Sequence, residues 1–256
     1  MNILKTEFDK LILNSVNNNH IQESSFYYDS IYTEELKRQL KKKGVFEKFE
    51  KRELKEVAPG KVKMCSVASS SRLCFLYFYE KENIDLECSL STGTKGNAQL
   101  DAVNGSVFYE CKCHEIFDEH DHLSIAYKKN LIELFGIICN ASEDGSFCNL
   151  TLEDFEINQN KSIYQLSFDM KQFLCHLFGI SKNGGGTLQY IFFIPDNELI
   201  QQNNWCIDVY KKLDEEINMI WNSPKIKSMI AQNNISLPRP LKIEVSKIED
   251  FVMENL

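Results

Sequence analysis

The strongest constraint on the fold is a stretch in which polar and apolar side chains alternate in three short runs. In the run 84–90 every second residue is apolar, as in a β-strand with one buried face. A glycine-containing loop, 91–96, separates it from two similar runs, 98–103 and 106–113. Asn104-Gly105 joins these two, and Asn-Gly favours a type I′ hairpin turn because both central residues need positive φ. The sequence therefore predicts a three-stranded antiparallel meander.

Helical spacing and turn residues organise the rest of the chain. Apolar residues recur at intervals of three and four, which predicts helices over 3–16, 33–43, 123–135, 163–178 and 205–231. Thr33 is the expected cap of the second of these helices. Gly44, Gly136 and Gly179 are expected to end the second, third and fourth. Breaks or turns are predicted at 17–19, 59–60, 183–186 and 223–224. Apolar runs predict strands at 188–194 and 242–245, the latter before a short terminal helix.

The apolar run 73–79 fits either a helix or a buried strand, because periodicity does not distinguish them over so short a length. The serines at 69–71 can cap a helix and therefore favour the helix. The resulting order of elements predicts an α/β fold with a mixed sheet flanked by helices. Residues 67–195 would form the core, with 1–66 as a helical N-terminal extension and 196–256 as a mainly helical C-terminal extension packed on it.

Composition and cysteine usage bear on the class of protein and its compartment. With 43% hydrophobic and 26% charged residues, the 256-residue chain resembles a globular protein and not a disordered one. The nine cysteines are an odd number and no apolar run follows a basic start, so we expect reduced thiols in the cytoplasm. No apolar stretch approaches the roughly 20 residues that span a bilayer, so no membrane partner is expected.

The charge balance, taken alone, argues against a nucleic-acid partner. The net charge is −8, whereas binding to phosphates needs a basic surface, at least locally. One basic cluster exists: Lys37, Arg38, Lys41, Lys42, Lys43, Lys48, Lys51 and Arg52. Glutamates are interleaved with it, which favours a solvated helix face over a DNA contact.

The meander places an acidic pair beside a lysine. Glu110 and Lys112 share one face of the third strand, and Asp101 lies on the second strand across the tight turn. Two carboxylates so placed can hold Mg²⁺ or Mn²⁺, the metal can polarise a phosphate, and the lysine can steady developing charge. A cross-strand salt bridge on a surface hairpin is the alternative. Charges inside an apolar strand are costly unless they are paired or functional, and this favours a site.

Asp101, eight intervening residues and then Glu110-Cys111-Lys112 resemble the signature of the PD-(D/E)XK nuclease superfamily, which includes type II restriction enzymes. Leu100 stands where the named signature has proline. The resemblance implies a core of helix, three-stranded meander, helix and fourth strand. It also implies a Mg²⁺- or Mn²⁺-dependent endonuclease acting on DNA, commonly as a homodimer. Asp101 and Glu110 would bind the metal, and Lys112 would assist the water nucleophile.

A closer resemblance is to a bacterial group of predicted restriction endonucleases. It rests on Asp85-Leu86-Glu87, 97–102, 110–115, Asp169-Met170-Lys171-Gln172 and 176–179. It implies Glu87 as a further catalytic carboxylate and metal ligand, Gln172 as a catalytic side chain, and Lys171 and His176 as contacts to the substrate. Other roles stay open: Glu87 as a solvent-facing edge residue, Gln172 and His176 as a polar helix face, and Glu115 as a structural residue.

Other chemistries find less support. Cys111, Cys113 and His114 cluster, but on a strand the cysteines face away from the histidine, and no second paired-cysteine motif follows. No dinucleotide-binding glycine motif, Walker A sequence or nucleophile elbow is present. The rival hypothesis is a catalytically silent nuclease-like fold that serves as a binding or assembly module, which the negative charge favours. A non-specific DNA-repair nuclease or an RNA nuclease is a third interpretation.

Overall fold

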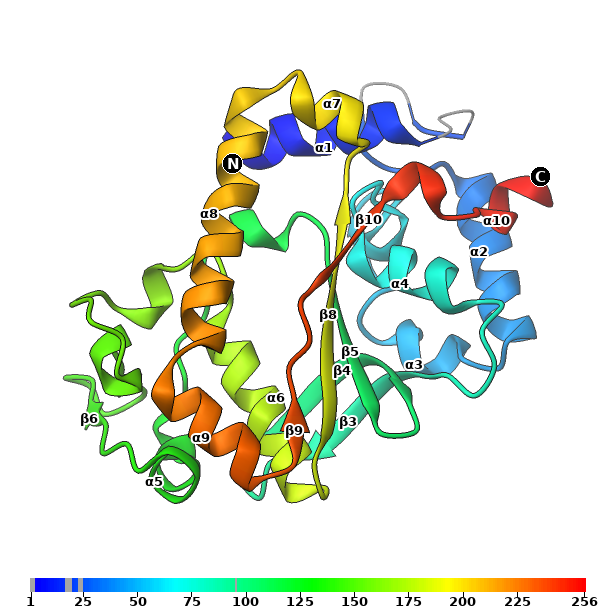
Figure 1. Cartoon of the computed structure of the whole chain (residues 1–256). Coiled ribbons are helices and arrows are strands. Elements are labelled where there is room, and N and C mark those ends of the chain that lie inside the picture. Colours follow the sequence, from blue (N-terminus) through cyan, green and yellow to red (C-terminus); the bar gives the residue numbers. More distant parts are fainter. Residues whose placement is uncertain (1–2, 17–19, 23–24, 95) are drawn as a thin grey trace.

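The centre of the computed structural model, which describes residues 3–16, 20–22, 25–94 and 96–256, is a mixed sheet with helices on both faces (Figure 1). The strands run in the order β10-β8-β5-β4-β3, and β9 pairs with β8. The predicted antiparallel meander is confirmed as β3 (Asp85–Ser91), β4 (Asn97–Asn104) and β5 (Val107–Lys112). Parallel pairing joins β8 (Gly186–Ile194) to β5, and β9 (Ile235–Ser236) and β10 (Leu241–Glu244) to β8. The fold is therefore α/β, and the segment after residue 195 adds strands to the same sheet.

The turn between β4 and β5 lies one residue later than predicted. Asn104 still pairs with Val107, so the two loop residues are Gly105 and Ser106. Gly105 has a φ of +57°, whereas Ser106 has no positive φ. A glycine at the first loop position, with a positive φ there and not at the second position, fits a type II′ turn. The prediction of a type I′ turn at Asn104-Gly105 is therefore wrong.

Helix α4 (Ser70–Phe78) covers one face of the sheet. The Ser69 hydroxyl accepts the main-chain N–H of Arg72 at 3.2 Å and caps the helix, so the preference for a helix after the serine run is confirmed. The ring of Phe78 lies 4.8 Å from that of Tyr109 on β5. Because strand side chains alternate, α4 lies on the face opposite to Glu110 and Lys112.

Helix α6 (Met170–Lys182) covers the other face and corrects the prediction of a helix over 163–178. It begins after Asp169, whose carboxylate accepts the N–H of Gln172 at 2.9 Å. It also runs through Gly179 instead of ending there. A Cβ added to Gly179 would lie 2.8 Å from Ala98 Cβ, so this glycine allows the helix to pack closely on the sheet.

The other helices lie around these layers (Figure 1). On the side of α4 are α2 (Ser30–Lys42), α3 (Phe46–Glu50) and α10 (Phe251–Glu254); on the side of α6 are α5 (Lys128–Phe135), α8 (Asn204–Trp221) and α9 (Pro224–Gln232). At the end of the molecule shown at the top are α1 (Ile3–Ser15) and α7 (Asn197–Gln201). Two small hairpins are formed by β1 (Glu56–Ala58) with β2 (Lys61–Val62), and by β6 (Asn140–Ala141) with β7 (Cys148–Asn149).

The predicted helices exist, and the differences lie at their ends. α2 begins before Thr33, because the carboxylate of Asp29 accepts the N–H of Tyr32 at 2.8 Å and is the cap. α5 begins at Lys128, later than predicted, and ends at Gly136, which has a φ of +62°. The break between α8 and α9 at Ser223-Pro224 is confirmed. The break predicted at 17–19 lies outside the described residues.

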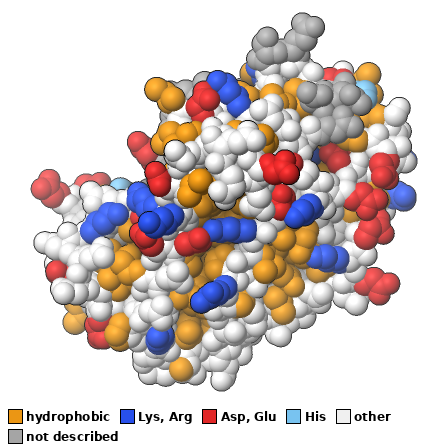
Figure 2. All heavy atoms as spheres, turned by 45° about the horizontal axis from the view of Figure 1, so that its top comes forward, with side chains coloured by type: hydrophobic (Ala, Val, Ile, Leu, Met, Phe, Trp, Pro, Cys, Tyr) orange, Lys and Arg blue, Asp and Glu red, His pale blue; other side chains and the backbone are white. Residues whose placement is uncertain are grey.

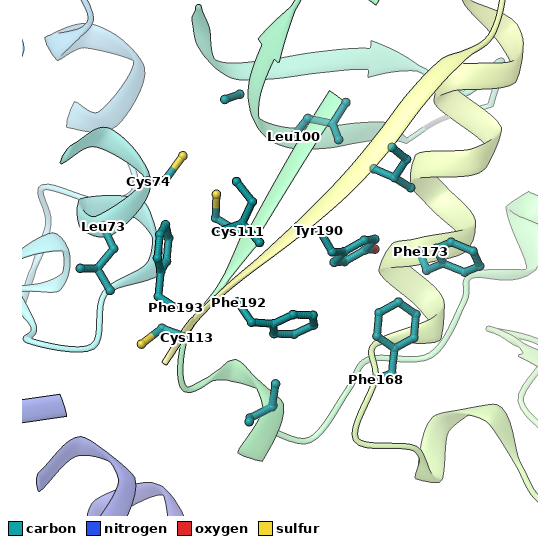
Figure 3. Close-up of a cluster of buried hydrophobic side chains, with 14 of the residues drawn as sticks. Leu73, Cys74, Leu100, Cys111, Cys113, Phe168, Phe173, Tyr190, Phe192 and Phe193 are labelled. Atoms are coloured by element: carbon teal, nitrogen blue, oxygen red, sulfur yellow. The ribbon is translucent and has the colours of Figure 1, made fainter. Parts of the chain in front are cut away.

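Strand β8 is buried on both faces. In Figure 3, Phe193 points towards Leu73 and Cys74 of α4, while Tyr190 points towards Phe173 of α6. All of these side chains are buried. A central parallel strand is expected to be apolar throughout for this reason, which explains why the run at 188–194 was recognisable as a strand.

The described ranges contain no helix that is both long and apolar enough to cross a membrane. All nine cysteines carry free thiols, and Cys88 is the one that is partly exposed.

Candidate functional site

The acidic pair predicted from the sequence meets where β4 and β5 begin to separate. Regular pairing between the strands ends with Ala102 and Tyr109. One step further along, Asp101 Oδ2 accepts the main-chain N–H of Cys111 at 2.6 Å. The same register places Asp101 across from Glu110, and residues opposite each other in an antiparallel pair share a face. Both carboxyl groups therefore belong to the face of the sheet that α6 covers.

Glu110, Lys112 and Gln172 form a closed triangle of contacts. Lys112 Nζ lies 2.7 Å from Glu110 Oε1 and 2.6 Å from Gln172 Oε1. Gln172 Nε2 donates to the same Glu110 Oε1 at 2.7 Å. Because Asp169 caps α6, the first turn of the helix presents Gln172 to the strand. The helix thus holds both charged residues of β5 in place.

His176 lies one turn further along α6 and behind Glu110. Its Nε2 is 2.8 Å from the carbonyl of Gln99 and 3.4 Å from Glu110 Oε2. Burial, assisted by the charge of Lys112, lowers the pKa of His176 to about 4, so the ring is neutral at pH 7 and its Nε2–H donates to Gln99. The side chain is 0% exposed. It therefore contacts Glu110 in this structure and presents no surface to a substrate, in contrast to the contact implied by the family resemblance.

Glu110 carries an unsatisfied oxygen. The residue is 2% exposed, and among the described residues Oε2 has no hydrogen-bond partner. A buried carboxylate oxygen without a donor is unfavourable by about 1–3 kcal/mol or more. A cation would remove this deficit.

Glu87 has an unusual backbone for a strand residue. Its φ is +51°, in the left-handed region that residues other than glycine seldom adopt. The register of β3 on β4 places it across from Asp101, between the pairs Leu86–Ala102 and Cys88–Leu100. Strained backbone of this kind is concentrated at functional sites.

The three carboxyl groups repel one another. Burial raises the pKa of Asp101 well above its ordinary value, and the charge of Glu110 raises it further. Burial likewise raises the pKa of Glu87 to about 7, with Asp101 as the next cause. Burial raises the pKa of Glu110 to about 7, against the opposing effect of Lys112. Asp101, Glu110 and Glu115 thus act on one ammonium, and Glu87 adds a further acid beside Asp101; this surplus of negative charge suits a divalent cation.

The lysine stays charged in this environment. Burial lowers the pKa of Lys112, but Glu110, Glu115 and Asp101 raise it more, so the net shift is upward. At neutral pH the site therefore keeps a cationic donor next to its acids.

The side chains alone do not enclose a metal ion. Among the described residues, no group of three or more His, Cys, Asp or Glu side chains is disposed to hold one. Glu110 Oε1 faces Lys112 and Asp101 faces a main-chain N–H, so each carboxylate is partly turned away from the other. In a strand the N–H and C=O of one residue point to the same side, so the Cys111 carbonyl faces the side of Asp101 and could complete a ligand set with water.

A pocket of about 220 Å³ adjoins the site at Lys112. Lys171 lies outside its lining, with Nζ 3.4 Å from Asp121 Oδ2 at the rim. His120, which the sequence places in a polar loop, donates its Nε2–H to the carbonyl of Ser167 at 3.0 Å, and its Nδ1 lies 3.7 Å from Asp169. No local sequence pattern links His120 to a segment almost fifty residues away, so its place in the pocket wall could not be predicted.

The residues around the Cys-x-Cys pair have separate partners. His114 Nδ1 lies 2.8 Å from Asp9 Oδ1. Glu115 accepts the N–H of Cys113 at 2.6 Å and the hydroxyl of Ser70. Glu115 thus ties the end of β5 to the start of α4, which is the structural role left open for it.

Three of the eight residues in the basic cluster near α2 have an acidic partner among the described residues. Lys37 lies 2.7 Å from Glu34, Arg38 lies 2.6 Å from Glu35, and Lys48 contacts Asp85. On the face drawn in Figure 2, blue and red side chains are interspersed, without a continuous basic band among the residues shown in colour. This favours the solvated-face interpretation.

Comparisons of the chain with models of protein families, with curated proteins and with solved structures find no match.

Proposed function

We propose that the chain is a Mg²⁺-dependent nuclease that hydrolyses phosphodiester bonds, with DNA as the first candidate substrate. The observation that carries this proposal is the convergence of Asp101, Glu110 and Lys112 with Gln172 on one face of the sheet, with more negative charge than the lysine neutralises. Groups that need a partner which the chain does not supply are typical of functional sites.

Each residue has a definite role in the proposal. Asp101 and Glu110 would hold Mg²⁺ or Mn²⁺, with Glu87 as a further ligand beside Asp101. When bound, the ion would polarise the scissile phosphate and lower the pKa of a water ligand. Gln172 holds Glu110 and Lys112 in register through its two contacts.

Lys112 is suited to contact the reacting phosphate. Glu110 and Gln172 occupy two of the three donors of its ammonium, so a third remains for a phosphate oxygen or for the attacking water. Its positive charge would stabilise the charge that develops as the bond breaks.

The rival function is a catalytically silent fold that binds or assembles with another protein. The net charge of −8 and the acidic partners of Lys37, Arg38 and Lys48 favour it, because a long duplex needs many unpaired cations. A homodimer and a cytoplasmic location remain expectations, the first of which sedimentation of the purified protein would test.

The test is cleavage of unmethylated phage and plasmid DNA, and of an RNA of similar length, with Mg²⁺, with Mn²⁺ and with chelator. Lys112→Met should lose cutting by about 10²-fold or more. The matched control is Lys182→Met at the far end of α6, where Lys182 pairs with exposed Glu133; it should cut normally.

Discrete fragments would indicate a sequence-specific enzyme, and a smear would indicate a non-specific nuclease. Equal cutting by the Lys112→Met protein would remove this site from consideration. No cutting under any metal, together with no heat of Mg²⁺ or Mn²⁺ binding in calorimetry, would favour the silent module.

A further inference from the structure

The pocket beside Lys112 has an aromatic floor. It lies at the carboxyl ends of β5 and β8, and we call it the Tyr190 pocket after the residue opposite Glu110. Figure 3 shows Tyr190, Phe192 and Phe168 on the same side of β8, and all three line the pocket. Leu213 of α8 adds a further apolar wall. The three rings are 2–3% exposed, so a flat ligand ring would contact a small part of each.

The rest of the pocket lining is rich in hydrogen-bond acceptors. The lining includes these carboxylates: Glu115, Asp118, Glu119, Asp121 and Asp169. Lys112 and His120 are the lining residues that can be cationic. A phosphate would be repelled here, whereas N–H groups of an uncharged ligand would find acceptors.

The carboxylates are too dispersed to act as one cation site. Asp118 pairs with Lys5, and Asp121 pairs with Lys171 at 3.4 Å. Asp169 caps α6 and lies near His120. Glu119 is exposed at the rim, and no hydrogen bond or ion pair to it is found among the described residues. The lining thus offers a free acceptor at the rim above an aromatic floor.

The size of the pocket limits what can enter. Its volume of about 220 Å³ is smaller than that of pockets for drug-sized ligands, which are roughly 300–1,000 Å³. It suits a heterocycle of one or two rings and not a base pair. Because it adjoins Lys112, a ring held there would belong to a nucleotide next to the phosphate under attack.

We propose that the Tyr190 pocket binds an unpaired nucleobase that carries an amino group, so that the enzyme acts on single-stranded or unpaired nucleic acid. The identification of the neighbouring phosphate rests on the proposed nuclease function. In a duplex a base is stacked and paired, and it reaches such a pocket only after it has been extruded. Carboxylates accept hydrogen bonds from exocyclic amino groups such as N4 of cytosine. Contact with aromatic rings binds single strands without a broad basic surface, in keeping with the net charge of −8.

The first experiment needs no catalysis. The full-length protein in chelator is titrated with cytidine, adenosine, guanosine and thymidine, and binding is followed by NMR. Ser167→Trp places a large ring in the pocket from a partly exposed lining position, and Ser228→Trp on exposed α9 is the matched control. The amino-bearing nucleosides should bind the wild type and the control more tightly than thymidine does. Ser167→Trp should weaken their binding about tenfold or more, the effect expected for one stacked base.

The milder variant Glu119→Ala keeps the proposal testable if Ser167→Trp fails to fold, since Glu119 is exposed. It should reduce the preference for amino-bearing nucleosides over thymidine, while Glu143→Ala in a distant exposed loop should not. Binding of all four nucleosides with equal affinity to every variant would overturn the proposal.

The second experiment joins the pocket to the reaction. Single-stranded oligonucleotides that lack one base at successive positions are cut in Mg²⁺. Loss of one particular base should slow cutting about tenfold, and Ser167→Trp should abolish that dependence on position. Failure of nucleosides to bind, with cutting of intact duplex retained, would overturn the pocket and leave the nuclease. Nucleoside binding without any cutting would support the pocket and overturn the proposed function.

Discussion

Two buried charged clusters in this protein differ in whether their charges balance. In the Arg72 cluster, between α2, α4 and α10, the guanidinium of Arg72 is 1% exposed and lies 3.2 Å from Asp250. It also donates to the Tyr32 hydroxyl at 3.2 Å and to the carbonyl of Val67 at 2.9 Å, and it lies over the ring of Tyr28. One cation thus meets one anion and neutral acceptors. In the candidate site, by contrast, Glu110, Asp101 and Glu115 set three carboxyl groups against the single ammonium of Lys112, and Glu87 lies across from Asp101.

The comparison separates a structural ion pair from a candidate site. Arg72 and Asp250 neutralise each other's charge, although Arg72 Nε has no hydrogen-bond partner among the described residues, so removing either one leaves an unpaired charge. At Lys112, Glu110 Oε2 has no hydrogen-bond partner among the described residues, and burial raises the pKa values of Glu87 and Glu110 to about 7 each. We therefore expect mutations in the first cluster to reduce stability, and mutations in the second to reduce activity without loss of stability.

The largest effect is expected for Asp101→Asn. The amide can still accept the N–H of Cys111, so the hairpin should keep its geometry. Cutting in Mg²⁺ should fall by about 10³-fold, because the proposed metal ligand loses its charge. The urea midpoint in chelator should stay equal or rise, since the repulsion from Glu110 is removed. A clearly lower urea midpoint would show that Asp101 stabilises the fold. It would contradict the distinction between a structural Arg72 cluster and a functional site at Lys112.

The next effect is on folding alone. Arg72→Met should lower the free energy of unfolding by about 3–5 kcal/mol, because Asp250 is left as a partly buried charge without its partner. Urea denaturation followed by tryptophan fluorescence measures it. Cutting per folded molecule should be unchanged.

The double variant Arg72→Met/Asp250→Leu is the control for this prediction. It should recover part of the lost stability, since apolar replacements of both partners are often tolerated. An equal loss in the single and double variants would mean that packing, and not charge balance, explains the effect.

A smaller effect should depend on pH. Glu87 has a pKa raised from 4.5 to about 7 in the folded protein, so the folded state holds the proton more tightly than the unfolded state between these values. The folded wild type should therefore lose stability relative to Glu87→Gln as pH rises from 4.5 to 7, with no further change above. Thermal melts of both proteins in chelator between pH 4.5 and 8 measure the difference. A gap in melting temperature that is independent of pH would contradict the raised pKa.

The smallest effect is expected on the surface. Lys37→Ala and Arg38→Ala remove residues that pair with Glu34 and Glu35 on the exposed side of α2. Stability should change by about 0.5 kcal/mol or less, and cutting should change by less than about twofold. A steep loss of DNA binding, with a reduced salt dependence, would instead place the substrate on α2.

The meander and its two flanking helices could be predicted because their signals are local. Alternation in β3 and β4, the serine cap of α4 and the apolar run of β8 each depend on neighbours in sequence. Two of the errors occurred where distant residues decide, whereas the turn at Gly105-Ser106 and the start of α2 at Asp29 depend on neighbours in sequence. Gly179 lies inside α6, where Ala98 of β4 approaches it closely. Ser167 and Phe168 lie outside α6 because the Glu216 carboxylate accepts their main-chain N–H groups.

The candidate site follows the same rule. The pairing of Asp101 with the Glu110 strand was predictable from the hairpin, and the resemblance suggested Gln172. The burial of His176 behind Glu110 and the left-handed φ of Glu87 were not predictable, because both depend on how α6 and β4 meet β5 and β3. A polar residue on a helix face carries no sign of whether it will face solvent or a buried acid.

The parallel pairing of β5 with β8 has a consequence for the order of events during folding. The hairpin of β4 and β5 closes over two residues, whereas Gln172 reaches Glu110 across a sequence separation of 62. Local contacts form early and distant ones late, since closing a long loop is slow. In a nascent chain, Glu110 and Lys112 would first be exposed to solvent on the hairpin, with ordinary pKa values and without activity. The docking of α6 and β8 would then bury both side chains. The candidate site should therefore form during the slowest folding phase.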